Sequence, residues 1–304
     1  MRYKLIPAVL THIATRTLRS TMILVLSSFS LLTLLSSCVS MIHPISRNDH
    51  PSWRDFSWQY DGNNYNFRLQ LSPVIYKEFR SRTRLREYDL FASDYFSKTF
   101  IKKLTMTLYK YGTRMGVRKN DLPRFIVSFV QNLPYTSDDV TTGHDEYPRF
   151  PYETLYDNGG DCEDTSILAS AMLYSLGYDV ALLRFPRHMA VGIKCRPNNE
   201  QSFYQSQGIS YCYLETTGKD WDIGVIPPQI KDSSAQVKPI ITRPSLLTEF
   251  VAKFHTINDE KIVGVEVLVT NLGSQRAQGI TILISLRESP ANRIKDQIRS
   301  QPFH

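Results

Sequence analysis

A cysteine near the middle of the chain stands where helical geometry favours a reactive thiol. Cys162 lies in the run "NGGDCEDTSILASAML", after two glycines and before apolar residues that repeat with helical spacing. Asp161 is a residue type that caps helices, and Gly177 is a typical stop, so the sequence predicts a helix that begins at the cysteine. Backbone N–H groups in a first helical turn are unpaired, and they can stabilise a thiolate or an oxyanion.

The acidic neighbours of this cysteine have the opposite effect. Asp161, Glu163 and Asp164 place negative charge beside the sulfur, and nearby negative charge raises the pKa of a thiol. A protonated histidine close by would restore the balance in favour of the thiolate.

Two later segments supply such a histidine and a carboxylate. Residues 188–195 ("HMAVGIKC") and 211–217 ("YCYLETT") alternate as strands do. A period of two puts His188, Ala190 and Gly192 on one face, where the small residues would let a helix approach. If the strands pair with matched parity, Glu215 lies beside His188 and can hold its tautomer. The order cysteine, histidine, acid predicts a triad for acyl transfer.

Two of the four cysteines are expected to lie close together. Cys195 and Cys212 share a face of these neighbouring strands, opposite to the face of His188. If they oxidise, we expect them to pair with each other and to spare Cys162.

The N-terminal segment has the features of a secretory signal. Four basic residues precede the apolar run 22–35, which is shorter than the ~20 residues of a membrane-spanning helix. The end of this segment, "LSSC", resembles the bacterial lipobox, which predicts a signal peptide over residues 1–37 and lipidation of Cys38; an uncleaved signal anchor is the alternative. In both cases the rest of the chain lies outside the cytoplasmic membrane, in the cell envelope.

The charge of the chain does not indicate a nucleic-acid partner. The formal net charge is +7, and four of these charges belong to the basic residues before Cys38. The remainder carries only about +3, so we exclude nucleic acid as a partner.

The rest of the pattern divides the chain into segments. Alternation around "DGNN" predicts a hairpin within residues 56–71, and helical spacing predicts helices over 94–111 and from Pro123 to before Pro134. Residues 134–156 are expected to form a long surface loop. We expect a tether over 38–54, one domain over 55–228, a linker over 229–254 and a β-rich tail over 255–304, in which 263–269 and 280–286 form a hairpin or part of an Ig-like sandwich.

At this point three motifs carry a family resemblance. "GGDCEDTSIL", "HMAVGI" and "YLETT" resemble the motifs of the transglutaminase-like cysteine superfamily, in its secreted or membrane-attached bacterial and archaeal branch. The resemblance covers residues 55–228. It implies an α+β, papain-like core in which the cysteine at a helix N-terminus packs on an antiparallel sheet. Cys162 would be the nucleophile, His188 the general base and acid, and Glu215 the orienting acid. Most members have Asp in place of this Glu, so Asp222 is the alternative orienter.

The resemblance implies two further roles. Periplasmic proteases of the superfamily hold calcium with an Asp-Cys-Glu-Asp run, and Asp161 and Glu163 match its positions; the alternative is that these acids only compensate the helix dipole. In papain-type enzymes a glutamine supports the oxyanion hole, a role that Gln131 could take; the alternative is a surface glutamine at a helix end.

Together these features predict a lipid-anchored thiol acyl-transfer enzyme that acts on peptide or protein amides outside the cytoplasmic membrane. Hydrolysis is expected rather than transamidation, because water is abundant and members outside the animal transglutaminases are often peptidases. No cofactor is required, although calcium remains open. The alternative is a binding module of the cell envelope that keeps the fold without turnover.

Overall fold

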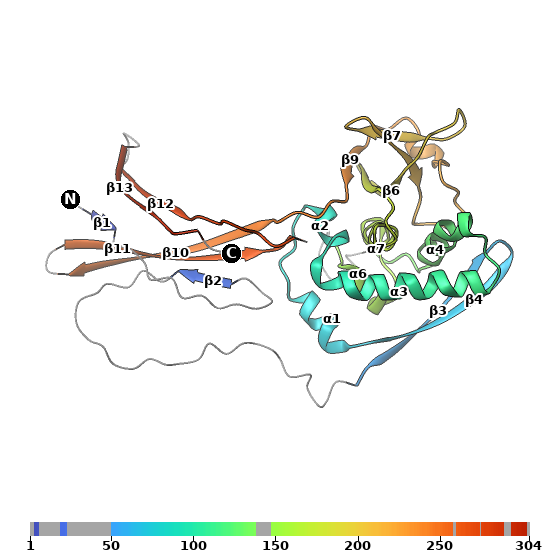
Figure 1. The fold of residues 1–304 in the computed structure, drawn as a ribbon, viewed down its shortest axis with the longest axis horizontal. Coiled ribbons are helices and arrows are strands. Elements are labelled where there is room, and N and C mark those ends of the chain that lie inside the picture. The colour runs from blue at the N-terminus through green and yellow to red at the C-terminus, as the bar shows by residue number, and fades with distance from the viewer. Residues whose placement is uncertain are drawn as a thin grey trace. The chain divides into compact units, whose positions relative to one another are not determined.

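The computed structural model describes residues 3–5, 19–22, 50–137, 147–257, 260–273, 275–288 and 293–302. The chain divides into two compact units (Figure 1). We call Ile45–Thr242 the main unit, and Met1–Pro44 together with Arg243–His304 the strand unit. Cys38 lies outside the described residues, as do most of the segments expected to be signal peptide and tether.

The main unit begins with the β-hairpin that the alternation predicts. Strands β3 (Ser52–Tyr60) and β4 (Asn63–Leu71) pair in antiparallel register. The turn between them uses Asp61 and Gly62, both at positive φ, which is a conformation that glycine and aspartate tolerate. Trp58 and Tyr65 pair across the strands and are buried among aromatic side chains of the helices.

Helices follow the hairpin in the described part of the main unit, and the sequence predicts only those near residues 94–111, 123–133 and 162–176. The observed helices are α1 (Pro73–Arg80), α2 (Tyr88–Ala92), α3 (Tyr95–Arg114), η1 (Lys119–Asp121), α4 (Leu122–Gln131), α6 (Pro151–Asp157) and α7 (Cys162–Ser175). The sequence predicts a surface loop over 134–156, and this is wrong for its last part. Residues 151–155 of α6 are buried because this short helix packs against α7. With seven residues, α6 is too short to show a helical period in the sequence.

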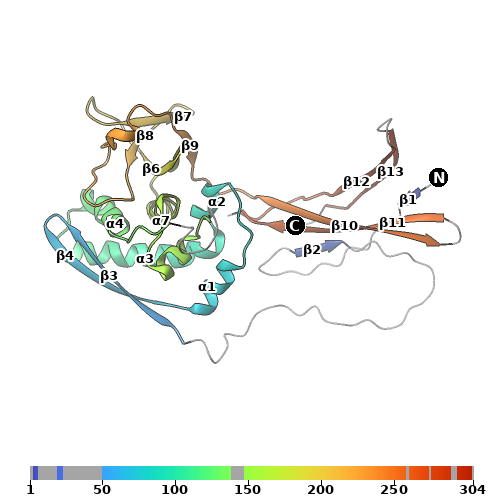
Figure 2. The same cartoon turned by 180° about the vertical axis from the view of Figure 1, so that it is seen from behind.

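A five-stranded sheet completes the main unit. Its order is β7 (Phe203–Ser206), β8 (Ile209–Leu214), β6 (His188–Lys194), β5 (Val180–Phe185) and β9 (Gln236–Pro239), with antiparallel pairing throughout. Helix α7 packs against this sheet, as both views show (Figures 1 and 2). It contacts the face of Met189 and Val191, so the expectation that a helix approaches Ala190 and Gly192 is wrong.

The opposite face of the sheet is covered by the sheet's own outer strands and by the chain between β8 and β9. The two outer strands, β7 and β9, contact each other, so the sheet curls around that face. Ala190 packs there with Leu183 and Tyr213, and a Cβ on Gly192 would lie 2.8 Å from the Tyr211 Cβ. Small residues are needed because the curled sheet is tight, not because a helix lies there. The main unit is therefore a mixed α and β structure with antiparallel sheets, one of them curled.

The observed segment boundaries differ from the expected ones. β3 begins at Ser52, inside the expected tether. The expected linker 229–254 contains β9, which pairs with β5, and the first part of the next long strand. Ile240 is buried and its N–H donates to the Val180 carbonyl, so the chain beyond residue 228 still belongs to the main unit.

The strand unit consists of two hairpins and two short added strands. β10 (Leu246–Ile257) and β11 (Glu260–Asn271) pair in antiparallel register, and β1 (Tyr3–Leu5) and β2 (Arg19–Met22) both pair with β11. β12 (Leu283–Glu288) pairs with β13 (Arg293–Arg299). The expected hairpin between residues 263–269 and 280–286 is therefore wrong: each segment pairs with another strand, and they meet only through side chains, where valines of β11 pack against isoleucines.

Among the described residues, no helix has both the length and the apolar character that a membrane span requires.

Candidate active site

The first turn of α7 is fixed by its own carboxylates. Asp161 is the N-cap, and its Oδ1 accepts from the backbone N–H of Glu163 (3.1 Å) and Asp164 (3.2 Å). Asp164 returns the contact, since the Asp161 N–H donates to its Oδ2 at 3.4 Å. This reciprocal cap sets the start of the helix at Cys162.

The two glycines before the cap are needed for close approach. A Cβ on Gly159 would lie 2.7 Å from the Pro134 carbonyl oxygen, and one on Gly160 would lie 2.5 Å from the Asp164 Cβ. Gly160 also forms a parallel bridge with Tyr135. The chain after α4 is thereby held against the entry to α7.

A buried ion pair anchors the same turn from the other side. Arg149 is 1% exposed and Asp164 is fully buried, and the Arg149 guanidinium donates to the Asp164 carboxylate. The Arg149 backbone N–H donates to the other carboxylate oxygen at 2.7 Å. Arg149 also pairs with Asp157 of α6 at 3.2 Å. The negative charge of Asp164 is thus neutralised by Arg149 inside the protein, which weakens its effect on the thiol.

Cys162 is half-buried and lies between an acceptor and a donor. Its Sγ donates to Glu163 Oε2 at 2.9 Å. Burial raises the pKa of the Cys162 thiol, and the charge and hydrogen bond of Glu163 and the charge of Asp161 raise it further. The Met189 backbone N–H, which hydrogen-bonds to the sulfur, lowers it. The thiol is therefore protonated in this arrangement.

Asp161 and Glu163 lie close enough to affect each other. Burial raises the pKa of Asp161 to about 6, with added contributions from the charge of Glu163 and a hydrogen bond between the two side chains. Two carboxylates in contact are the hard oxygen ligands that calcium prefers, so the donor chemistry fits a calcium ion. Across the described ranges, no group of three or more His, Cys, Asp or Glu side chains is arranged to hold a metal.

The histidine and the acid lie in contact. His188 Nε2 is 3.0 Å from Glu215 Oε2 and 3.2 Å from the Tyr213 hydroxyl. The register of β6 and β8 pairs Val191 with Leu214, which puts His188 and Glu215 on the same face as matched parity requires. Since the Met189 N–H binds the Cys162 sulfur, the residue next to His188 is also in contact with the cysteine.

Glu215 is held as an anion by a full set of donors. Its Oε1 accepts from the backbone N–H of Thr216 (2.9 Å) and Thr217 (3.0 Å) and from the Thr217 hydroxyl (2.7 Å), while the Tyr213 hydroxyl donates to Oε2 at 2.5 Å. Burial raises the pKa of Glu215, but the hydrogen bond and charge of His188, together with the Tyr213 and Thr217 donors, lower it to about 2. A carboxylate of this kind can orient a histidine and stabilise its charged form.

Several polar residues beside these groups were not predicted from the sequence. Tyr213 shares the face of Glu215 two positions earlier, and this parity is the signal that could have identified it. The hydroxyls of Thr165, Ser166 and Thr216 meet in the interior between α7 and the sheet. The sequence indicates these three residues less clearly. Each lies a few positions after a candidate site residue, but no pattern in the sequence shows that their side chains are buried.

The two secondary candidates lie elsewhere than expected. Gln131 is 5% exposed, and its Nε2 donates to the carbonyls of Glu215 (2.9 Å) and Trp221 (3.1 Å), so these N–H groups hold the chain after β8 and do not support an oxyanion. The alternative of a surface glutamine is wrong as well. Asp222 pairs with Arg124 at the surface, so it does not orient His188.

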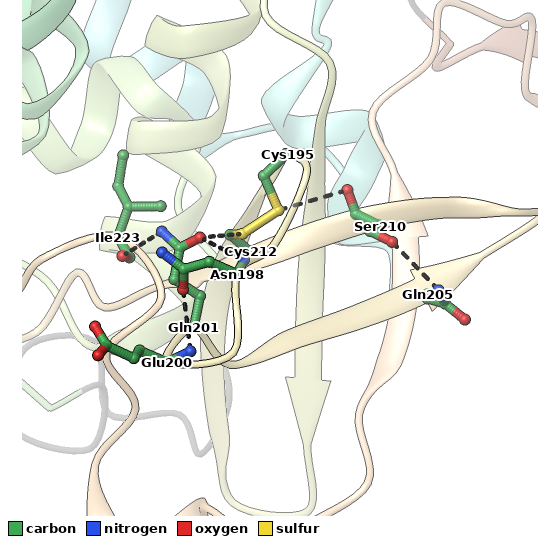
Figure 3. The surroundings of a disulfide bond; sticks show 8 residues. All are labelled: Cys195, Asn198, Glu200, Gln201, Gln205, Ser210, Cys212 and Ile223. Atoms are coloured by element: carbon green, nitrogen blue, oxygen red, sulfur yellow. Dashed lines mark hydrogen bonds between the residues drawn. A yellow bond between two sulfur atoms is a disulfide. The ribbon is translucent and has the colours of Figure 1, made fainter.

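A disulfide joins the end of β6 that is distant from His188 to β8 (Figure 3). Cys195, just after β6, is bonded to Cys212 of β8, with their Cα atoms 5.8 Å apart. Among the described residues, Cys162 is the free cysteine. Figure 3 also shows Gln201, whose Nε2 donates to the Ile223 carbonyl at 3.4 Å and so connects the segment between the two cysteines with the chain after β8.

The comparisons with known proteins give a distant structural similarity. The sequence matches no protein-family model, and no curated protein is significantly similar to it. Among solved structures, calcium-bound Legionella pneumophila LapG is 20% identical with a TM-score of 0.28, and the match covers 55% of this chain and 80% of that one. EGTA-treated LapG is 19% identical with a TM-score of 0.26 over 48% and 81% of the two chains. Similarity of this extent does not assign the chain to a family.

Proposed function

We propose that the protein is a thiol acyl-transfer enzyme that acts on peptide or protein amides through Cys162, His188 and Glu215. One observation carries the proposal: a buried, anionic Glu215 binds His188, and the residue next to this histidine donates to the Cys162 sulfur. The sequence motifs around all three residues support the same conclusion by their resemblance to the transglutaminase-like cysteine superfamily, which implies a papain-like core.

The contacts of His188 support a division of roles between its two ring nitrogens. Nε2 faces Glu215, so in this proposal Nδ1 exchanges a proton with the thiol. The Cys162 proton moves to Nδ1 as the sulfur bonds to the amide carbonyl carbon. The same proton then passes to the leaving nitrogen when the C–N bond breaks, which leaves a thioester on Cys162. Water then attacks the thioester carbonyl and gives a proton to His188. The C–S bond breaks, the acyl group leaves as a carboxylic acid, and His188 returns the proton to the Cys162 sulfur.

The start of α7 provides a donor for the negatively charged oxygen of the intermediate. Asp161 accepts the N–H groups of Glu163 and Asp164 through its side chain, and the Thr165 N–H donates to its carbonyl. The Cys162 N–H is the remaining N–H of this turn, and it belongs to the residue whose sulfur attacks. It is the oxyanion donor in this proposal.

Activation of the thiol requires a change at Glu163. In the arrangement described above, the Glu163 carboxylate accepts the thiol proton and raises the pKa of Cys162. Asp161 and Glu163 would be the residues that hold a calcium ion, whose charge would offset theirs beside the sulfur. With this charge offset, the thiol would exchange its proton with His188.

Calorimetry tests the calcium site directly. We expect calcium to bind the main unit and the Glu163→Gln variant to bind it at least about tenfold more weakly, because one of the two carboxylates is lost. Glu200→Gln, at an exposed position away from the site, is the control. If the unaltered protein produces no heat of binding, the calcium site is wrong, and acyl transfer then requires Glu163 to leave the thiol without the ion.

The lipobox-like segment adds a location to the proposal. Cys38 carries the lipid, and the enzyme is attached to a membrane of the cell envelope with extracytoplasmic peptides or proteins as substrates. Metabolic labelling with a palmitate analogue tests this anchor. The Cys38→Ala variant is expected to lose the label, and equal labelling of both proteins would contradict it.

A second candidate function rests on the hydrogen bond from Cys162 to Glu163. A thiol held in its protonated form beside two carboxylates suits a binding module of the envelope that keeps the fold without turnover.

Incubation of the main unit with a peptide library, with and without an added amine, separates these functions. The acyl-transfer enzyme releases peptide fragments, and an added amine does not redirect most of the products if hydrolysis dominates. Cys162→Ala is expected to abolish all products. Peptides that bind without any conversion, equally in both proteins, would favour the binding module.

A further inference from the structure

We propose that three buried hydroxyls, those of Thr165, Ser166 and Thr216, hold the three triad residues at their working distances. We call this group the hydroxyl cluster. It rests on the proposed function for its purpose, but its effect on Cys162 can be measured whether or not turnover is found. These residues do not touch substrate in this proposal; they are positioning residues.

The three hydroxyls of the cluster contact one another through Thr216 and contact two backbone carbonyls. The Thr216 Oγ1 is 3.0 Å from the Thr165 Oγ1 and 3.0 Å from the Ser166 Oγ. Thr165 donates to the Asp161 carbonyl at 2.7 Å, and Ser166 donates to the Met189 carbonyl at 3.1 Å. All three hydroxyl residues are at most 2% exposed, so water does not compete for these bonds.

Each contact ends at a residue next to a member of the triad. Asp161 precedes Cys162, Met189 follows His188, and Thr216 follows Glu215. These three places are on different elements, α7, β6 and the end of β8. A shift of any one element relative to the others must therefore stretch a hydrogen bond of the cluster before it separates sulfur, imidazole and carboxylate.

Counting protons identifies the residue that joins the elements. Thr165 and Ser166 each have one hydroxyl proton, and both protons are used on backbone carbonyls. The Thr216 proton can then be donated to only one of its two neighbours at a time. Removal of the Thr216 hydroxyl removes this shared hydrogen bond between α7 and the chain after β8, while the two carbonyls keep their donors.

Thr216→Val tests this role with little loss of fold, because valine has nearly the shape of threonine. Thr105→Val is the matched control: Thr105 is fully buried in α3, and its hydroxyl donates only to the Ile101 carbonyl of its own helix. Both variants are expected to lower the melting temperature of the main unit by about 2–4 °C. Thr216→Ser keeps the hydroxyl and is the rescue variant.

The readouts are kcat and KM for a cleaved peptide, and the rate of iodoacetamide alkylation of Cys162 as a function of pH. We expect Thr216→Val to lower kcat by about tenfold to a hundredfold with KM unchanged, to slow alkylation and to change its pH profile. Thr216→Ser and Thr105→Val should behave like the unaltered protein in both assays.

The alkylation assay separates failure of this inference from failure of the proposed function. If no peptide is cleaved by the unaltered protein, the proposed function fails, and alkylation alone then decides the role of the cluster. A Thr216→Val protein that matches Thr105→Val in alkylation rate and pH profile would overturn the inference. The same holds if Thr216→Ser is as slow as Thr216→Val.

Discussion

At the scale of single residues, burial and Glu163 together govern the state of the Cys162 thiol. Burial raises the pKa of the thiol, and the Glu163 carboxylate, 2.9 Å from the sulfur, raises it further together with Asp161. A backbone hydrogen bond from Met189 lowers it. Position at a helix N-terminus is therefore not sufficient for a reactive cysteine, because burial and nearby negative charge raise the pKa of the thiol.

We predict that Glu163→Gln lowers the pKa of the Cys162 thiol. The ultraviolet absorbance of the thiolate, followed as pH is raised, should have a midpoint lower by about one pH unit or more, because one adjacent negative charge is removed. In the main unit Cys162 is the only thiol, since Cys195 and Cys212 are bonded to each other. An unchanged midpoint, equal to that of the control Glu200→Gln, would contradict a contribution of Glu163 to the raised pKa.

Glu215 links the site to stability. Its folded pKa is about 2, below the ordinary value of 4.5, because His188, Tyr213 and Thr217 favour the anion more than burial disfavours it. A group with a lowered folded pKa adds stability above its unfolded pKa and loses it as pH falls through the folded value. The relevant range is therefore from about pH 4.5 down to pH 2.

We predict that Glu215→Gln removes this pH dependence. Denaturant unfolding of the unaltered main unit should lose on the order of 3 kcal/mol from this group between about pH 4.5 and 2. The variant should be less stable at neutral pH and should lose less on acidification. Parallel pH curves for the two proteins would contradict the lowered pKa of Glu215.

At the scale of elements, a buried ion pair fixes the start of α7. Arg149, which precedes α6, binds Asp164 in the first turn of α7, and neither side chain is exposed by more than 1%. A buried carboxylate whose charged partner is removed is strongly destabilising, whereas removal of both charges is much less so.

We predict that Arg149→Met lowers the free energy of unfolding by about 3–5 kcal/mol. The second substitution Asp164→Asn in the same chain should recover part of this loss, because it removes the unpaired charge while an oxygen remains to accept the Asp161 N–H. Denaturant unfolding of the single and the double variant measures these changes in the free energy of unfolding. A loss below about 1 kcal/mol for the single variant would mean that the pair does not anchor the helix.

The contact of His188 with Glu215 could be predicted because a strand period of two determines which residues share a face. The only further condition was that β6 and β8 pair so that these two faces coincide. The same reasoning could not choose the face on which α7 packs. That choice depends on how the sheet curls, and β9, which closes it, comes from a segment without a clear period. Gln131 and Asp222 were misplaced for a related reason: their partners lie more than 80 positions away in the chain.

At the scale of the whole molecule, the boundary of the main unit lies after β9. The pairing of β9 with β5 and the burial of Ile240 both fall beyond residue 228, where the sequence pattern ends the domain. The chain covering Ile45–Thr242 contains all contacts of the candidate site described above.

We predict that a fragment of residues 45–242 folds alone and that a fragment of residues 45–228 is less stable by about 2 kcal/mol or more, because Ile240 and the β9 pairing are lost. Thermal unfolding followed by circular dichroism compares the two. Equal melting temperatures would place the boundary at residue 228 after all.

The central claim is that His188 activates Cys162, and the most direct measurement is the rate of iodoacetamide alkylation of Cys162 against pH in the unaltered main unit and in His188→Ala. We expect the unaltered protein to react at least about tenfold faster than His188→Ala near neutral pH. Its alkylation rate should also show an inflection with pH that the variant lacks. Equal rates in both proteins at every pH, with a titration like that of a free cysteine, would contradict it.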